Sequence, residues 1–417
     1  MSQASLLTDE EKRVKIYSNV DRPTVPSEVT HDIPLESLNF NWSEKELPER
    51  ERTKHVHRLH PYLGKFIPQL VEILLRKYFE PGQTVLDPFC GSGTTLVQAN
   101  ELGINSIGYD VSAFNVLLCR AKVKKYNFEK TRREVLDILN KLRSVIQANS
   151  RQPSLWETES SLLTLPETDD RYLREWFAPQ ALGELLTYRS LIDSEGYECR
   201  DLLKVILSRS ARSARLTTHY DLDFPKHPQT EPYWCYKHSR ICHPTTEAFK
   251  FLRRYSLDTL RRIEAFSLRR TNATVKIHHA DSRRAIFPPI DGIITSPPYV
   301  GLIDYHEQHA YAYHLLSLED KRASEIGSAA NGSSQKAQEQ YQKDIARVFK
   351  RAVNSMPQGA WVIVVAHDRS NLYGEIARMS GMETKAVLDR HVNRRTGRRS
   401  SEFYESIFVW QKSVSYD

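Results

Sequence analysis

The chain has few cysteines and no long apolar segment. Its five cysteines are scattered along 417 residues, without the regular spacing of a disulfide framework. The amino-terminal residues show no apolar core of a signal peptide, and no apolar run approaches the roughly 18 residues that a membrane-spanning helix needs. These absences argue against a disulfide-rich secreted protein and predict a cytoplasmic protein, or a nuclear one in a eukaryote, with no membrane partner.

No internal repeat is present, and the composition is that of a globular protein. Hydrophobic residues make up 40% of the chain and charged residues 27%, which is not typical of disorder. A chain of this length forms two domains, or one large domain with an insertion.

Positive charge is concentrated in one segment. The whole chain has 59 Lys and Arg against 52 Asp and Glu, for a formal net charge of +7. Residues 200–270 alone contain 15 basic and 7 acidic residues, so the rest of the chain is close to neutral. Such a segment is expected of a surface that binds a polyanion, although a solvated helix face has the same composition.

The hydrophobic pattern of the first third predicts a doubly wound α/β fold. Residues 66–79 have helical spacing, and residues 84–86 form a short apolar strand. A glycine-rich turn, a helix to about residue 102 and a second strand at residues 106–110 follow. This order of elements is the opening unit of a mostly parallel sheet.

The pattern stops after this unit and resumes late in the chain. Later strands are expected at residues 275–278, 292–295 and 361–365, and antiparallel closing strands at residues 387–391 and 406–410. A polar stretch at residues 319–340 is expected to be a mobile loop. The expected organisation is an amino-terminal arm (1–54), a first part of the main domain (55–127), a mostly helical basic insert (128–271) and a second part (272–417).

The glycine-rich turn has the sequence DPFCGSGTT at residues 87–95. Such a turn lets the backbone approach a ligand and presents amide N–H groups to it. Asp110 ends the next strand, where folds of this kind bind ribose hydroxyls with a carboxylate. The lysine of a P-loop and the third glycine of a dinucleotide fingerprint are both missing. The motif therefore favours another adenosine-containing cofactor.

The second motif, TSPPY at residues 295–299, directly follows an apolar strand. Two consecutive prolines give up both N–H groups, so carbonyl oxygens are the local hydrogen-bonding groups. Such a turn suits an amino group that must donate protons, and the tyrosine offers a face on which a base can stack. In isolation the motif is better explained by a turn that ends a strand.

Together the two motifs resemble the amino-group DNA methyltransferases, which use S-adenosylmethionine. The similarity extends to HPYLGKFIP at residues 60–68, IGYDVS at 107–112, ADS at 280–282, VVAH at 364–367 and SEFYE at 401–405. The resemblance implies a Rossmann-like class I methyltransferase fold, with a mostly parallel sheet, an antiparallel closing strand and the helical insert.

The resemblance also implies roles for individual residues. Asp110 is expected on the cofactor ribose and Asp281 near its adenine. The residues expected to bind the cofactor are Tyr62, Phe66, Asp87, Phe89, Gly91, Ser92, Gly93, Thr94, Asp110, Val111, Ser112, Asp281 and Ser282. The residues expected to hold the target base and act in catalysis are Ser296, Pro297, Pro298 and Tyr299.

In the family, SPPY is typical of enzymes that act on N4 of cytosine, whereas adenine-N6 enzymes more often have Asp or Asn in place of the serine. The sequence thus predicts a cytosine-N4-specific DNA methyltransferase, with adenine N6 as the alternative. The base would be flipped out of the duplex and stack on Tyr299. Its amino group would donate to the Pro297 carbonyl and the Ser296 hydroxyl. Cys90 is not expected to be a nucleophile.

The helical insert is expected to recognise double-stranded DNA, because few residues follow the last predicted strand. Arg209, Arg212 and Arg215 are spaced to share a helix face that binds phosphates. A second basic cluster, expected near the substrate cleft unless it is a solvated hairpin tip, consists of Arg394, Arg395, Arg398 and Arg399.

The insert also contains Cys235, His238, Cys242 and His243, whose spacing is compatible with zinc. Two paired Cys-x-x-Cys knuckles are lacking, so the favoured interpretation is chance clustering and no metal site.

The sequence leaves open the class of function, the partner and the oligomeric state. An RNA methyltransferase that acts on tRNA amino groups carries related motifs, and a degenerate methyltransferase kept as a DNA-binding subunit is the non-enzyme alternative. A cognate restriction endonuclease as a separate chain fits the prediction. Both a monomer and a dimer are compatible with it.

Overall fold

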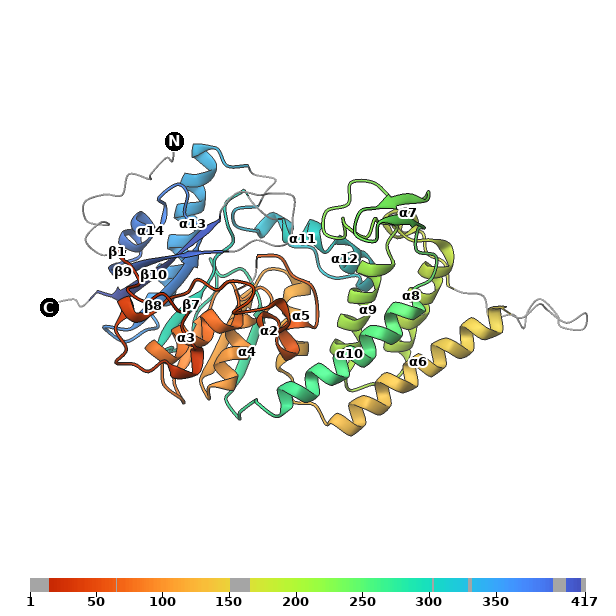
Figure 1. The fold of residues 1–417 in the computed structure, drawn as a ribbon, viewed down its shortest axis with the longest axis horizontal. Helices are drawn as coiled ribbons and strands as arrows, with labels where there is room; N and C mark the ends of the chain where they lie inside the picture. The colour runs from red at the N-terminus through yellow and green to blue at the C-terminus, as the bar shows by residue number, and fades with distance from the viewer. Residues whose placement is uncertain are drawn as a thin grey trace, which may run out of the picture.

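The computed structural model describes residues 15–64, 66–150, 166–301, 304–328, 332–392 and 403–413. An α/β part and a helical lobe lie side by side in it (Figure 1). Within these residues, no helix combines the length and the apolar character needed to cross a membrane.

The α/β part is built on one eight-stranded sheet with the order β1-β9-β10-β8-β7-β2-β3-β6. The strands are β1 (Lys15–Ile16), β2 (Thr84–Asp87), β3 (Asn105–Asp110), β6 (Val275–His279), β7 (Gly292–Thr295), β8 (Trp361–Ala366), β9 (Met382–His391) and β10 (Tyr404–Lys412). All neighbours pair in parallel except β10, which is antiparallel to both β8 and β9. The predicted parallel sheet with antiparallel closing strands is therefore confirmed.

Helices cover both faces of this sheet because successive strand residues point to opposite sides. In β8, Val362 and Val364 pack in the core beneath α13 and α14, whereas Ile363 packs in the core beneath α3. The helices of the α/β part are α2 (Glu49–Arg52), α3 (Pro68–Tyr78), α4 (Thr94–Glu101), α5 (Ala113–Val123), α13 (Gln335–Val353) and α14 (Tyr373–Met379).

The insert forms the helical lobe on the right of Figure 1. Its helices are α6 (Phe128–Ser150), α7 (Arg171–Trp176), α8 (Pro179–Ser194), α9 (Arg200–Ala214) and α10 (Phe249–Ser267). Two short helices, α11 (Tyr305–Gln308) and α12 (Ala310–Leu316), lie between the lobe and the sheet. Phe114 of α5, Leu203 of α9 and Tyr311 of α12 belong to one hydrophobic cluster. The lobe is therefore packed onto the α/β part through a shared core.

Three local features differ from the sequence-based expectation. The amino-terminal segment is more than an arm, because β1 adds an edge strand to the sheet and Leu38 and Phe40 are buried in its core. The polar stretch expected as a loop contains the start of α13 at Gln335. The insert contains a two-stranded hairpin, β4 (Tyr233–Cys235) and β5 (Arg240–Cys242), which its sequence pattern did not indicate.

Candidate active site

A hollow of about 850 Å³, open to solvent, lies at the carboxyl ends of β2, β3, β6 and β7. Parallel sheets of this kind bind ligands at this edge, where the loops that follow neighbouring strands meet. The segments that line it are the turn after β2, the end of β3, the residues after β6 and β7, and the loop at residues 324–326.

The glycine-rich turn after β2 depends on two glycines with positive φ. Gly91 has a φ of +47°, and a β-carbon there would lie 3.2 Å from the Tyr62 hydroxyl oxygen. Gly93 has a φ of +76°, and its β-carbon would lie 2.7 Å from Cys119 Sγ. Other residues rarely adopt this conformation. Gly91 keeps the hollow open, whereas Gly93 begins α4 and lets it pack against α5.

Asp110 ends β3 and presents a partly buried carboxylate to the hollow. Its Oδ2 accepts from the Gly91 amide at 2.8 Å, and its Oδ1 accepts from the Ser112 amide at 2.8 Å and from Asn115 Nδ2 at 3.1 Å. Burial raises the pKa of Asp110 to about 6, although these hydrogen bonds act to lower it. The carboxylate is thus fixed between the two turns and can accept from hydroxyl groups of a ligand.

We expect cofactor affinity to fall as the pH is lowered through about 6, because a protonated Asp110 loses its charge and part of its accepting capacity. Isothermal titration with S-adenosylmethionine between about pH 5.5 and about pH 7.5 measures this. The Asp110→Asn variant should show a flat profile over the same range. An unchanged slope in that variant would assign the titration to another group, such as Asp87.

The contribution of the Asp110 carboxyl to the free energy of unfolding should have the opposite pH dependence, since it decreases as the pH rises. A raised pKa means that the folded state binds the proton more tightly than the unfolded chain does. This contribution is present below about pH 4 and is lost as the pH rises through about 6.

Aromatic rings close one wall of the hollow. The Tyr62 ring stacks on Tyr305 at a centroid distance of 5.5 Å and on His309 at 5.6 Å. The Tyr62 hydroxyl accepts from Asn115 Nδ2 at 3.1 Å. Since Asn115 also donates to Asp110, one amide connects the aromatic wall to the carboxylate.

Asp87 joins the two strands that carry the two sequence motifs. Its Oδ1 accepts from Thr295 Oγ1 at 2.6 Å, across the neighbouring strands β2 and β7, and from the Phe89 amide at 3.2 Å. Burial raises the pKa of Asp87 to about 6. The contact fixes the TSPPY turn relative to the glycine-rich turn.

The ADS segment after β6 closes the hollow on its other side. Ser282 Oγ donates to the Pro88 carbonyl at 2.6 Å. Asp281 forms an ion pair with Arg283, with Nη2 and Oδ2 2.9 Å apart. Burial opposes ionisation of Asp281, but the Arg283 hydrogen bonds outweigh it and lower the pKa of the carboxyl. Asp281 therefore stays an acceptor at the edge of the hollow.

The TSPPY turn is held from two sides. The Tyr299 hydroxyl donates to Glu405 Oε1 at 2.9 Å, and Glu405 is paired with buried Arg390. The Tyr341 hydroxyl donates to the Pro298 carbonyl at 2.8 Å. Burial raises the pKa of Tyr299, so its hydroxyl remains protonated. These contacts fix the ring of Tyr299 beside the hollow.

A second aromatic group lies next to this turn. The His367 ring is 6.1 Å from the Tyr299 ring and stacks on Phe403 at 4.0 Å, measured between centroids. His367 follows β8 and Phe403 precedes β10, so both belong to the late strand motifs. Ring faces of this kind can accept a planar base by stacking.

The thiol of Cys90 is not suited to nucleophilic attack. Cys90 is buried, and its Sγ lies 4.0 Å from Cys119 Sγ. This hydrogen bond, followed by burial, raises the pKa of the Cys90 thiol. A protonated thiol is a poor nucleophile, which agrees with the expectation from sequence.

The structure brings most of the predicted residues to one hollow. Those that line it are Tyr62, Phe66, Asp87, Phe89, Gly91, Ser92, Thr94, Asp110, Val111, Ser112, Asp281, Ser282, Ser296 and Pro298. Gly93, Pro297 and Tyr299 are not among the lining residues.

Other lining residues were missed by the sequence analysis. Asn115 lies on the first turn of α5, and no motif pointed to it. Tyr305 and Glu325 come from the segment after the TSPPY turn, which has no strand or glycine pattern to mark it. Glu325 forms an ion pair with buried His306. The available signal was a polar stretch with several acidic residues that follows an aromatic segment, and it is a weak one.

The three arginines expected on an exposed helix face are occupied inside the protein. Arg209 is 8% exposed and forms an ion pair with Asp258 at 2.7 Å. Arg212 pairs with Asp223, and Arg215, just after the end of α9, donates to the Leu222 carbonyl at 2.7 Å. The expected exposed face is therefore wrong. Arg394, Arg395, Arg398 and Arg399 lie outside the described residues.

Comparison with known proteins identifies the relatives of this chain. A family model described as DNA methylase, of the N6 and N4 methyltransferases, matches residues 8–118. The type II methyltransferase M.MjaII of Methanocaldococcus jannaschii is 38% identical over 87% of this chain and 81% of its own length. The type II methyltransferase M.BsoBI of Geobacillus stearothermophilus is 23% identical over 67% of this chain and 56% of its own length.

Solved structures resemble the chain only distantly. The crystal structure of TrmN from Thermus thermophilus has a TM-score of 0.31 at 13% identity, with 84% of this chain and 50% of that chain covered.

Proposed function

The chain belongs to the amino-group (N6 or N4) type II DNA methyltransferases, and from this premise we propose that it methylates N4 of cytosine within a specific sequence of duplex DNA. The methyl donor of this family is S-adenosylmethionine. The observation that carries the proposal is that Asp110 and Ser296 line the same hollow.

The residues of the hollow fit this cofactor. Asp110 is a partly buried acceptor fixed by two backbone amides, which suits ribose hydroxyls. Gly91 leaves a space that a β-carbon would fill. The Tyr62 and Tyr305 rings supply apolar surface beside it. When bound, S-adenosylmethionine supplies an activated methyl group, and the chain supplies position and hydrogen bonds.

The TSPPY turn would hold the amino group of the target base. The Ser296 hydroxyl is hydrogen-bonded to the Tyr299 side chain and retains accepting capacity for an amino proton. The Pro297 carbonyl is the second acceptor in this proposal. Donation of both amino protons frees the nitrogen lone pair for transfer. The base would be flipped out of the helix at a cost of a few kcal/mol and would stack on Tyr299.

The serine at the first position of SPPY favours cytosine over adenine. A hydroxyl is a neutral acceptor and donor, whereas the Asp or Asn that is more often found in adenine-N6 enzymes offers a carbonyl or carboxylate oxygen. Adenine N6 is the second candidate, because the same hollow and the same ring surfaces can accept either base.

We propose that the helical lobe recognises the DNA sequence. Its basic excess is exposed on the hairpin and at the start of α10, where Lys237, Arg240, Lys250 and Arg253 reach solvent. These side chains, in place of the occupied Arg209, Arg212 and Arg215, are the proposed phosphate contacts. A cognate restriction endonuclease as a separate chain would be the partner of such an enzyme.

Incubation with methyl-labelled S-adenosylmethionine and unmethylated duplex DNA, followed by nucleoside mass spectrometry, tests the proposal. N4-methylcytosine is the expected product. N6-methyladenine would keep the mechanism and overturn the inference from Ser296. Label in a parallel tRNA reaction alone would make the chain an RNA methyltransferase. Binding of the cofactor without label in either would indicate a degenerate subunit.

We expect Tyr299→Ala to lower the affinity for flipped-base DNA by about 10-fold to about 100-fold, because stacking on an aromatic ring is worth about 1–3 kcal/mol per base. Tyr299→Phe keeps the ring and should lose much less. Fluorescence of duplexes with 2-aminopurine at the target position measures binding and flipping together. Tyr17→Ala, which removes an exposed ring just after the edge strand β1, is the control. Equal losses in the Phe and Ala variants would assign the role to the hydroxyl.

A further inference from the structure

The segment between α9 and α10 has no hydrophobic core of its own. Residues 217–247 contribute no side chain to the buried clusters. Between residues 218 and 247 the only buried residues are Cys235 and Cys242. Its secondary structure is the hairpin of β4 and β5, with three residues in each strand. A hairpin this short is not stable by itself, so another interaction must hold it.

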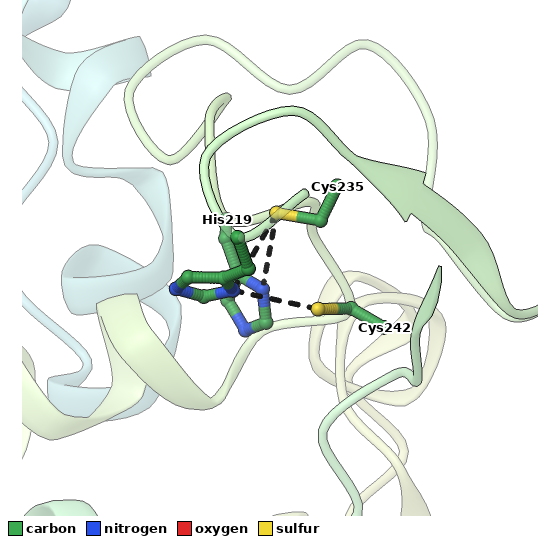
Figure 2. A group of neighbouring side chains, drawn as sticks. His219, Cys235 and Cys242 are labelled. Atoms are coloured by element: carbon green, nitrogen blue, oxygen red, sulfur yellow. Dashed lines mark hydrogen bonds between the residues drawn. The ribbon is translucent and has the colours of Figure 1, made fainter. Parts of the chain in front are cut away.

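Four side chains converge inside this segment. His219 comes from the loop after α9, and Cys235, His238 and Cys242 come from the hairpin (Figure 2). One ligand atom from each lies within 4.8 Å of all the others. The Sγ of Cys235 is 3.8 Å from His219 Nδ1 and 3.6 Å from His238 Nδ1. His238 Nδ1 is 3.4 Å from Cys242 Sγ.

These separations match a tetrahedral zinc site. Zn–S bonds of about 2.3 Å and Zn–N bonds of about 2.0–2.1 Å place sulfur and nitrogen ligands about 3.6 Å apart at the tetrahedral angle. Two thiols and two imidazoles are a common ligand set for structural zinc. Both cysteines are free thiols in this structure.

We propose that His219, Cys235, His238 and Cys242 bind one structural Zn²⁺ ion. Four protein ligands leave no open position, which is typical of a structural and not a catalytic ion. Binding would release the two thiol protons to solvent. This proposal differs from the sequence analysis, which favoured chance clustering and no metal site. It also differs in one residue, because His219, which is distant in sequence, takes the place of His243.

The backbone already holds the ligands in place. The His238 amide donates to the Cys235 carbonyl at 3.1 Å, and Ser239 adopts a positive φ of +51° to complete the turn. The His219 amide donates to the Tyr233 hydroxyl at 3.0 Å. That hydroxyl also lies 3.0 Å from His219 Nδ1, and a metal ion on this nitrogen would replace the contact.

The segment is tied to α9 on its other side. Arg212 pairs with Asp223, and the Gln229 amide donates to the Leu216 carbonyl at 2.8 Å. These contacts fix the loop but do not reach the hairpin. The His219 amide and the Tyr233 hydroxyl already join the loop to the hairpin. The zinc ion would add a second connection, and it would fix the strands that carry exposed Trp234 and Ile241.

Elemental analysis of the untagged full-length protein, purified under reducing conditions, tests the proposal. We expect about one zinc ion per chain. Cys235→Ser, Cys242→Ser and His219→Ala should lose it. His243→Ala is the matched control, because this exposed histidine adjoins Cys242 and is not a ligand in the proposal. Retention of zinc in His219→Ala with its loss in His243→Ala would overturn the ligand set.

Cobalt substitution gives a second readout that does not depend on methyl transfer. After removal of zinc with a chelator, Co²⁺ should produce the strong visible bands of a tetrahedral site and the ultraviolet band of thiolate ligation. If a cysteine variant does not fold, zinc added back to the chelated wild type should still raise its Tm. A folded wild-type protein that contains no zinc and gives no cobalt spectrum would contradict the proposal. A disulfide between Cys235 and Cys242 under reducing conditions would also contradict it.

Discussion

Asp110→Ala is expected to raise the Kd for S-adenosylmethionine by about 100-fold, or about 2.7 kcal/mol. The carboxylate is partly buried, and it is the acceptor that faces the hollow at the end of β3. Hydrogen bonds to a charged group contribute about 1.5–3 kcal/mol each. The variant also leaves the amides of Gly91 and Ser112 without their acceptor.

Isothermal titration in the absence of DNA measures this effect directly. Asp193→Ala is the matched control, because Asp193 is an exposed carboxylate on α8 that pairs with Arg189 and Arg200 at the surface. Circular dichroism shows whether the variant is folded. A Kd that changes by less than a factor of about three in a folded Asp110→Ala protein would remove Asp110 from the cofactor site.

Ser296→Ala is expected to leave cofactor affinity unchanged and to lower kcat by about 100-fold. Loss of a single positioned hydrogen-bonding group in an active site costs about 10²-fold to 10³-fold in rate. Here the lost group is the hydroxyl that would accept an amino proton of the target base. Ser296 lines the hollow with Pro298, whereas Asp110 is held by hydrogen bonds from Gly91, Ser112 and Asn115, so the cofactor side should be intact.

Single-turnover kinetics with saturating DNA separate chemistry from binding in this variant. Ser144→Ala, an exposed serine on α6, controls for the loss of a hydroxyl elsewhere. Ser296→Thr should recover part of the rate, because it restores the hydroxyl. Unchanged turnover in Ser296→Ala would sink the proposed role and would also weaken the argument for cytosine.

The short helices α11 and α12 connect the two functional parts of the molecule. Tyr305 of α11 stacks on Tyr62 in the cofactor wall. The guanidinium of Arg215 lies over the ring of Tyr311 in α12, with 4.4 Å between Arg215 Cζ and the ring centroid. Arg215 in turn holds the loop before the hairpin through the Leu222 carbonyl. The aromatic wall of the hollow and the loop before the hairpin in the helical lobe are therefore connected through the packed side chains of α11 and α12.

Local sequence patterns were enough to predict the sheet and the cofactor motifs. The alternation of apolar residues in strands and the glycine turn after β2 depend on neighbouring residues only. The carboxyl end of β3 follows from the same unit, which is why Asp110 could be assigned before the fold was known. The position of Ser296 beside the glycine-rich turn also followed, because strands of one parallel sheet end at the same edge.

Spacing on a helix did not predict which side of the helix is exposed. Arg209, Arg212 and Arg215 were expected to face solvent, but α9 is covered by α8, α10 and α12. A partner carboxylate such as Asp258 is distant in sequence, and only the packing of α10 brings it close. Asn115 and Glu325 were missed for the same reason, because only the packing of their segments places their side chains at the hollow.

The sequence by itself determined the family, the two motifs and the succession of strand, glycine-rich turn, helix and strand in the cofactor unit, because these depend on adjacent residues. The tertiary structure decided which polar side chains are paired and which are free to bind. His219 shows the difference most clearly. It is separated from Cys235 by a loop without any regular pattern, and His243 is the nearer histidine along the chain to Cys242. Only the folded loop after α9 places His219 against the hairpin, because proximity in space comes from chain reversal and packing.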